Sequence, residues 1–283
     1  MNCLDIINDK LAYLKGVGIE TSKLEMRILM EYVLQLNHHE SFSMYQELTS
    51  QQINTFSQLV DMRALHMPID KIVGHKGFYK YDFEVSNDVL SPRPDTEILV
   101  ESAIKLLQQN SYARILEFGV GSGCIILSLL AEIKDAKGWG IDISNEALKI
   151  TNNNSKKLNV DSRLNLINAS WFDDNVISSI NNAFDIIVSN PPYIKSDEIQ
   201  FLDKEVKDFD PLIALDGGND GLRDYIRIAE LAYVLLKKDG FLLFEIGENQ
   251  LSDVINIAKN NKLTLIDVVK DLSGTDRCII LKK

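Results

Sequence analysis

The feature that most constrains the fold of this chain is the alternation of short apolar runs with amphipathic stretches after residue 112. The apolar runs predict strands at residues 114–118, 138–142, 164–167, 186–189 and 241–246. Apolar residues spaced three and four apart predict helices near residues 123–133, 145–157, 222–238 and 249–260. Strands that alternate with helices predict an α/β fold, in which a mostly parallel sheet is covered on both faces.

The first part of the chain departs from this alternation. Residues 3–73 show helical spacing of apolar residues throughout, which predicts a small helical bundle. Within it, Thr21 and Ser22 indicate the start of a helix. Residues 74–91 change to a period of two, which predicts a short hairpin.

A proline-containing junction and a β-type tail complete the pattern. Pro92 and Pro94 hold the junction extended, and Asp95 or Thr96 is expected to cap the helix that follows. The last two apolar runs, residues 263–269 and 278–281, are joined too closely for a helical crossover, so they are expected to pair as antiparallel strands. We therefore expect a helical domain, a hairpin with linker and an α/β domain, at residues 1–73, 74–96 and 97–283.

Composition excludes several classes of protein. The net charge of -11 argues against a protein that grips long stretches of nucleic-acid phosphate, because that affinity comes from many Lys and Arg contacts. No apolar run approaches the roughly 20 residues of a membrane span, so a cytoplasmic protein is expected. Neither a disulfide framework nor a metal site is expected from the spacing of the cysteines and histidines, which are Cys3, Cys124, Cys278, His38, His39, His66 and His75.

A glycine loop follows the first strand of the α/β region. The loop reads Gly119-Val120-Gly121-Ser122-Gly123, and its alternate glycines let the backbone turn sharply and approach a ligand. The dinucleotide pattern would need glycine or alanine at position 124, where this chain has Cys124. The loop therefore predicts a small-molecule site other than an NAD site.

Two carboxylates near this loop indicate which molecule it holds. Glu117 repels a pyrophosphate but suits a cationic amino-acid group. Asp142 ends the next strand, where an acid accepts hydrogen bonds from both ribose hydroxyls; its alternative role is to cap the helix near Asn145. A ligand with an adenosine, a cationic tail and no phosphate is S-adenosylmethionine, and Ser170 and Trp171 are expected to flank its adenine.

The sequence Asn190-Pro191-Pro192-Tyr193 follows the fourth strand of the region. The prolines fix two φ angles and remove two N–H donors, so the turn offers oxygen acceptors without competing donors. The Asn190 amide oxygen and the Pro191 carbonyl are suited to hold an NH₂ group with its lone pair toward a sulfonium methyl group. Tyr193 supplies a flat face, and Asn190 is also expected to contact the cofactor. The loop therefore predicts methylation of an amide or aromatic amine.

These residues resemble the bacterial protein-glutamine methyltransferases, specifically the release factor glutamine methyltransferases of the PrmC/HemK family. The resemblance covers nearly the whole chain, and the junction reading Pro-Arg-Pro-Asp-Thr-Glu is its most specific part. The segments that carry it are residues 68–69 with Gly74, 89–97, 117–123, 142–144, 171–172, 190–194, 214–222, 245–247 with Gln250, and 274–277. Ser170 and Glu117 depart from the family pattern, which usually has aspartate at both positions.

The resemblance implies a Rossmann-like S-adenosylmethionine-dependent methyltransferase with a small helical front domain. Its implied substrate is the side-chain amide of the glutamine in the Gly-Gly-Gln motif of class 1 peptide chain release factors, and residues 1–73 help to hold that partner. Three alternatives stay open at this stage. They are an exocyclic-amine methyltransferase of DNA or RNA bases, a glutamine methyltransferase of a ribosomal protein, and a cofactor-binding module without activity.

Overall fold

The computed structural model describes residues 1–20, 23–36, 41–180 and 183–283. These residues divide into two compact units, of which one holds Met1–His75 with Asp203–Phe209 and the other holds Lys76–Leu202 with Asp210–Lys283. The chain thus leaves the larger unit for seven residues after Leu202, an excursion that the sequence did not predict. The expected helix start at Thr21 and Ser22, and the histidines 38 and 39, lie outside the described residues.

The smaller unit is helical, as its apolar spacing predicts. Its helices are α1 (Cys3–Gly16), α2 (Lys23–Val33), α3 (Ser50–Ala64), α4 (Ile69–Val73) and α9 (Lys204–Lys207), and the last of these belongs to the excursion. Thr49 and Gln52 form a capping box that starts α3. The core of the unit is built on buried side chains such as Met26 and Phe56. The buried Arg63 guanidinium lies 2.5 Å from the Glu205 carboxylate, which ties the excursion to α3.

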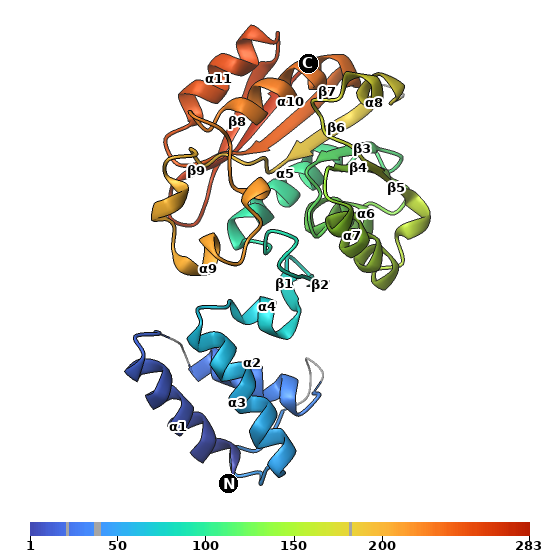
Figure 1. The fold of residues 1–283 in the computed structure, drawn as a ribbon. Helices are drawn as coiled ribbons and strands as arrows, with labels where there is room; N and C mark the ends of the chain where they lie inside the picture. Colours follow the sequence, from blue (N-terminus) through green and yellow to red (C-terminus); the bar gives the residue numbers. More distant parts are fainter. Residues whose placement is uncertain (21–22, 37–40, 181–182) are drawn as a thin grey trace. The chain divides into compact units, whose positions relative to one another are not determined.

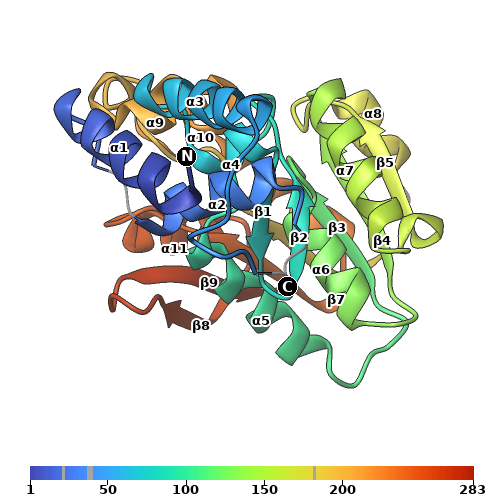
Figure 2. The ribbon, with the colours of Figure 1, turned by 90° about the horizontal axis from the view of Figure 1, so that it is seen from below.

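The larger unit is built on a seven-stranded sheet. Its strands are β3 (Arg114–Phe118), β4 (Lys137–Asp142), β5 (Leu164–Asn168), β6 (Phe184–Ser189), β7 (Leu236–Glu245), β8 (Thr264–Lys270) and β9 (Asp276–Lys282), in the order β5-β4-β3-β6-β7-β9-β8. The pairs among β3 to β7 are parallel, whereas β9 is antiparallel to β7 and to β8. Figure 2 shows β8 and β5 at opposite edges. The predicted parallel sheet with an antiparallel C-terminal pair is confirmed.

Helices cover both faces of this sheet (Figure 1). They are α5 (Glu97–Leu107), α6 (Cys124–Glu132), α7 (Asn145–Lys157), α8 (Asp174–Ser179), α10 (Arg223–Leu235) and α11 (Leu251–Asn260). Side chains alternate along the strands, so that Ile115 packs with α5 and α6 in one core while Leu116 packs with α10 and α11 in the other. A separate two-stranded sheet of β1 (His75–Phe78) and β2 (Tyr81–Glu84) precedes α5 at the predicted hairpin.

Two local predictions were wrong. Neither Asp95 nor Thr96 caps α5, because residues 94–96 form a turn of 3-10 helix and the Thr96 hydroxyl donates to the Glu245 carboxylate instead. The helix predicted to reach residue 238 ends at Leu235, and β7 starts at once. The reason is that Leu236 is buried and pairs with Phe184 across a β-bulge, so sheet pairing overrides local helical preference. Among the described residues, no helix is both long and apolar enough to cross a membrane.

Candidate active site

A pocket opens in the larger unit where the carboxyl ends of β3, β4 and β6 meet. β3 lies between the other two strands, so the loops after β3 and β6 separate there, which is the usual ligand position in open α/β sheets. The hollow, counted together with the open solvent at its mouth, is about 780 Å³. The pocket is therefore the candidate active site.

Most residues that the sequence singled out line this pocket. They are Glu117, Gly119, Val120, Gly121, Ser122, Asp142, Trp171, Asn190 and Pro192. Gly123, Ser170, Pro191 and Tyr193 are not among the lining residues, and the roles predicted for them stay predictions. Lining residues that no pattern marked as a cofactor site include Ile143, Ile213 and Ala214. Arg93, which lines the pocket, has its guanidinium 2.7 Å from the carboxylate of Asp210.

The glycine loop needs glycine for different reasons at different positions. Gly119, Gly121 and Gly123 have φ angles of 77°, 53° and 80°, which residues with a Cβ rarely adopt. A Cβ at Gly123 would lie 2.8 Å from the side chains of Leu127 and Thr151, so packing also excludes it. A Cβ at Gly121 would meet no atom within 4 Å. Gly121 therefore faces open space on the pocket wall.

The two predicted carboxylates both lie on the pocket and are both held by backbone N–H groups. Glu117 is 1% exposed and accepts a hydrogen bond from the Ile126 N–H at 2.9 Å, and burial raises its pKa well above the usual range. Asp142 accepts from the N–H groups of Gly121 and Ser144, both at 2.9 Å, and burial raises its pKa also. Each carboxylate oxygen has two lone pairs, so both groups can still accept hydrogen bonds from a ligand.

The helix after β4 is capped by another residue. The Ser144 hydroxyl accepts from the Ala147 N–H at 3.1 Å and starts α7. Asp142 therefore does not act as the side-chain cap of α7 and instead joins the glycine loop to the end of β4.

Trp171 also lines the pocket. The Trp171 ring lies close to the glycine loop, since a Cβ added at Gly119 would be 3.8 Å from it. The Trp171 Nε1 donates a hydrogen bond to the Asp224 carboxylate at 3.0 Å. Ser170 differs, because its hydroxyl accepts from the Phe172 N–H within its own turn. A glycine cradle, an aromatic side chain and two acids beside the glycine loop fit S-adenosylmethionine, which has a cationic tail, ribose hydroxyls and no phosphate.

Asn190 is the first member of a hydrogen-bond chain that sequence reasoning did not find. Its Nδ2 donates to the Thr96 hydroxyl at 3.3 Å, and that hydroxyl donates to the Glu245 carboxylate at 2.5 Å. Glu245 is 3% exposed, and burial is the main reason that its pKa rises to about 7. The ionisable groups that interact electrostatically with Glu245 are Asp95, Cys124, Tyr193, Tyr225, Arg277 and Cys278.

The predicted aromatic face, Tyr193, packs into the core behind the loop. Burial raises the pKa of Tyr193 to about 12. Gln250 Nε2 donates to the Tyr193 carbonyl at 3.0 Å and to the Gly221 carbonyl at 3.2 Å. Tyr193 thus anchors the end of the Asn-Pro-Pro-Tyr loop to the segments that follow it.

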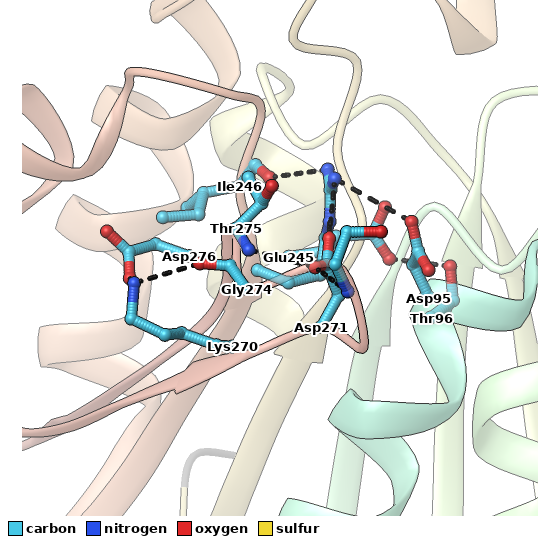
Figure 3. Close-up of polar contacts among 11 residues, drawn as sticks. Asp95, Thr96, Glu245, Ile246, Lys270, Asp271, Gly274, Thr275 and Asp276 are labelled. Carbon is cyan, nitrogen blue, oxygen red and sulfur yellow. Dashed lines mark hydrogen bonds and ion pairs between the residues drawn. The ribbon is translucent and has the colours of Figure 1, made fainter.

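A second polar cluster braces the other side of Glu245. The Arg277 guanidinium donates to the Ile246 carbonyl at 3.2 Å and to the Asp271 carboxylate at 3.1 Å, and it lies 3.6 Å from the Asp95 carboxylate. Figure 3 shows Asp95 and Thr96 at one side of this cluster, where Thr96 donates to the Glu245 carboxylate, and Ile246 at the other. The β8–β9 turn therefore supports the segment that carries Thr96.

Comparison with known proteins identifies the family. The family described as "PrmC N-terminal domain" matches residues 5–74, and "Methyltransferase small domain" matches residues 94–205. The release factor glutamine methyltransferase of Fusobacterium nucleatum is 38% identical over 99% of this chain and 78% of its own length. That of Caulobacter vibrioides is 37% identical over 94% of this chain and 91% of its own length.

A solved structure is also similar. The protein-(glutamine-N5) methyltransferase (release factor-specific) of Alicyclobacillus acidocaldarius is 29% identical and covers 71% of this chain and 99% of its own, with a TM-score of 0.43. Identities above 30% over nearly the whole chain carry the assignment. The chain therefore belongs to the family of release factor glutamine methyltransferases.

Proposed function

We propose that this protein transfers a methyl group from S-adenosylmethionine to the side-chain amide nitrogen of the Gly-Gly-Gln glutamine in class 1 peptide chain release factors. The observation that carries the proposal is the placement of Asn190 on the wall of a pocket whose other walls fit the methyl donor. Relatives that align with nearly the whole chain are release factor glutamine methyltransferases. The helical unit is proposed to help hold the release factor, and the protein to act in the cytoplasm, where translation ends.

The residues that would hold the cofactor follow from their chemistry. Asp142 would accept hydrogen bonds from the ribose hydroxyls, Glu117 would face the cationic tail, and Trp171 would pack beside the adenine. The glycine loop would hold the tail at Gly121, where a Cβ would meet no atom within 4 Å. The bound cofactor supplies a methyl group on a positively charged sulfur and leaves as S-adenosylhomocysteine.

The Asn190 loop prepares the nitrogen that receives the methyl group. An amide nitrogen is a poor nucleophile, because its lone pair is delocalised into the carbonyl group. The Asn190 Oδ1 and the Pro191 carbonyl accept the two N–H hydrogens, which favours a pyramidal nitrogen with its lone pair directed at the methyl carbon. The nitrogen lone pair would form the bond to the methyl carbon as the sulfur–carbon bond breaks, the sulfur would keep that electron pair, and the methylated nitrogen would release one proton to water. Positioning and electrostatic preorganisation thus provide the catalysis.

A substitution at Asn190 tests this function. Wild-type protein and the Asn190→Ala variant are incubated with cofactor and purified release factor, and mass spectrometry of the Gly-Gly-Gln peptide measures one added methyl group. Loss of the acceptor is expected to lower kcat by roughly 10²- to 10³-fold while calorimetry shows cofactor binding largely intact. The matched control is Ser155→Ala, which removes a buried hydroxyl on α7 that donates to the Asn152 carbonyl.

Two results would contradict the proposal. Full methylation by Asn190→Ala would remove the role assigned to the amide. Labelled methyl groups that appear only in nucleic acid, or only in a ribosomal protein, would show that the substrate is one of the alternatives.

A further inference from the structure

The Asn190 side chain can present either of two chemically opposite groups to a substrate. Its amide has an acceptor oxygen and a donor NH₂ of nearly equal size, so shape alone does not fix which one faces the pocket. The proposed reaction needs the oxygen there, since a substrate amide NH₂ brings two donors. If the Asn190 side chain were reversed, its own NH₂ would face the substrate NH₂, and neither could accept a hydrogen bond from the other.

The hydrogen-bond chain behind Asn190 has one direction when Glu245 is ionised. Thr96 has one hydroxyl proton, and it is given to the Glu245 carboxylate at 2.5 Å. The Thr96 oxygen can then only accept, and it does so from Asn190 Nδ2 at 3.3 Å. With Asn190 reversed, two acceptors would face each other without a proton between them. The amide that gives its NH₂ to Thr96 directs its Oδ1 the other way.

Burial makes this direction hard to reverse. Thr96 is 3% exposed and Glu245 is 3% exposed, so water has little access to replace either partner. The Tyr225 hydroxyl donates to the Glu245 backbone carbonyl at 3.0 Å, and Arg277 donates to the next carbonyl, that of Ile246. These two hydrogen bonds hold the end of β7 in place, and the Glu245 carboxylate is the last acceptor in the chain.

We propose that Glu245 and Thr96 are positioning residues, which orient the Asn190 amide so that its oxygen faces the methyl-accepting nitrogen. This inference rests on the proposed function and deepens it, because it assigns the acceptor character of the pocket to Thr96, which lines the pocket, and to Glu245, which is not among the lining residues. Both residues are assigned to act through Asn190.

Three variants test the chain. Thr96→Val keeps the shape but removes the hydroxyl, and it is expected to lower kcat about 30-fold with cofactor Kd unchanged. Thr96→Ser keeps the hydroxyl and is expected to retain kcat within about threefold. Glu245→Leu leaves the Thr96 proton free to turn toward Asn190 Oδ1, and it is expected to lower kcat as much as Thr96→Val. Ser155→Ala serves again as the matched control.

A spectroscopic measurement reads the orientation without any substrate. In protein labelled with ¹⁵N-asparagine, the Asn190 NH₂ signal is identified by its absence from Asn190→Asp. Its protons are expected to exchange slowly with water in the wild type and in Thr96→Ser, and at least tenfold faster in Thr96→Val and Glu245→Leu. If Thr96 only supported the fold, its replacement would not speed the exchange of the Asn190 NH₂ protons in particular.

Each outcome decides the proposal. It is overturned if Thr96→Val binds cofactor and keeps kcat within about twofold of wild type. If Thr96→Val does not fold, Glu245→Leu decides by the same criterion. If wild-type protein methylates no release factor, the proposed function fails, and the exchange rates alone decide the orientation: equal rates in wild type and Glu245→Leu overturn it, and selective loss of protection supports it.

Discussion

The contact between Trp171 and Asp224 gives a prediction about cofactor binding that does not depend on the catalytic loop. Trp171 lines the pocket, packs edge-on against Phe118 with ring centroids 6.3 Å apart, and donates its only N–H to Asp224. Asp224 lies in the first turn of α10 and is 1% exposed. The second oxygen of its carboxylate accepts from the half-exposed Arg223 at 2.9 Å. Asp224 therefore fixes the aromatic wall of the pocket.

Asp224→Ala is expected to cost about 2 kcal/mol of unfolding free energy. A hydrogen bond to a charged group contributes about 1.5–3 kcal/mol, and the low part of that range applies because the carboxylate is itself costly to bury. Burial raises the pKa of Asp224 above the ordinary 3.8, so the unfolding free energy of the wild type falls as the pH rises from that value through the folded-state pKa. The partly exposed Arg223 adds little.

Asp224→Asn is the matched control, since it keeps an acceptor for the indole and removes the buried charge. A loss of about 2 kcal/mol lowers Tm by roughly 4–8 °C in a unit of this size, whereas Asn is expected to stay within about 2 °C of wild type. Calorimetric titration with S-adenosylhomocysteine should show Kd raised about tenfold in Asp224→Ala only, because Trp171 is no longer held. Equal Tm and Kd in all three proteins, or an Asn variant as impaired as Ala, would refute the reasoning.

Three further outcomes are expected. Gly123→Ala should unfold at lower temperature than Gly121→Ala in thermal melts, because only at position 123 does the new Cβ meet atoms at 2.8 Å; Gly121→Ala should mainly weaken cofactor binding. Asp142→Asn should weaken cofactor binding about tenfold in calorimetry, because its NH₂ faces one of two backbone donors. The kcat of the wild type should rise with pH to a plateau above about 7, as Glu245 ionises, and Glu245→Gln should lack this step. Because burial raises the pKa of Glu245 from the ordinary 4.5 to about 7, the unfolding free energy should fall as the pH rises between these two values.

Much of the larger unit could be predicted because its sheet is buried on both faces. Strands such as β3 and β6 are short apolar runs, and their boundaries lie within two residues of the predicted ones. The antiparallel pairing of β8 and β9 followed from the shortness of their connection, which leaves no room for a crossover helix. The glycine loop could be recognised in the sequence because its positive φ angles require glycine.

Local patterns failed where distant residues decide the outcome. The start of β7 depends on Leu236 pairing with Phe184, some fifty positions earlier, and the residues between Leu236 and Gly240 look helical on their own. The excursion of residues 203–209 depends on Arg63 meeting Glu205. No spacing rule connects such pairs, because they arise only when the whole chain has folded.

Thr96 shows why such failures concentrate at the site. A threonine before a helix is expected to cap it, since the free N–H groups of the first turn need acceptors. In this chain the Glu245 carboxylate, 149 positions away, competes for the same hydroxyl. The carboxylate prevails because a buried acid without donors costs more than a helix end that solvent and a 3-10 turn can satisfy. Because Thr96 does not cap the helix, its oxygen is free to accept from Asn190, so the position where the local rule fails is the position that connects the end of β7 to the Asn190 loop.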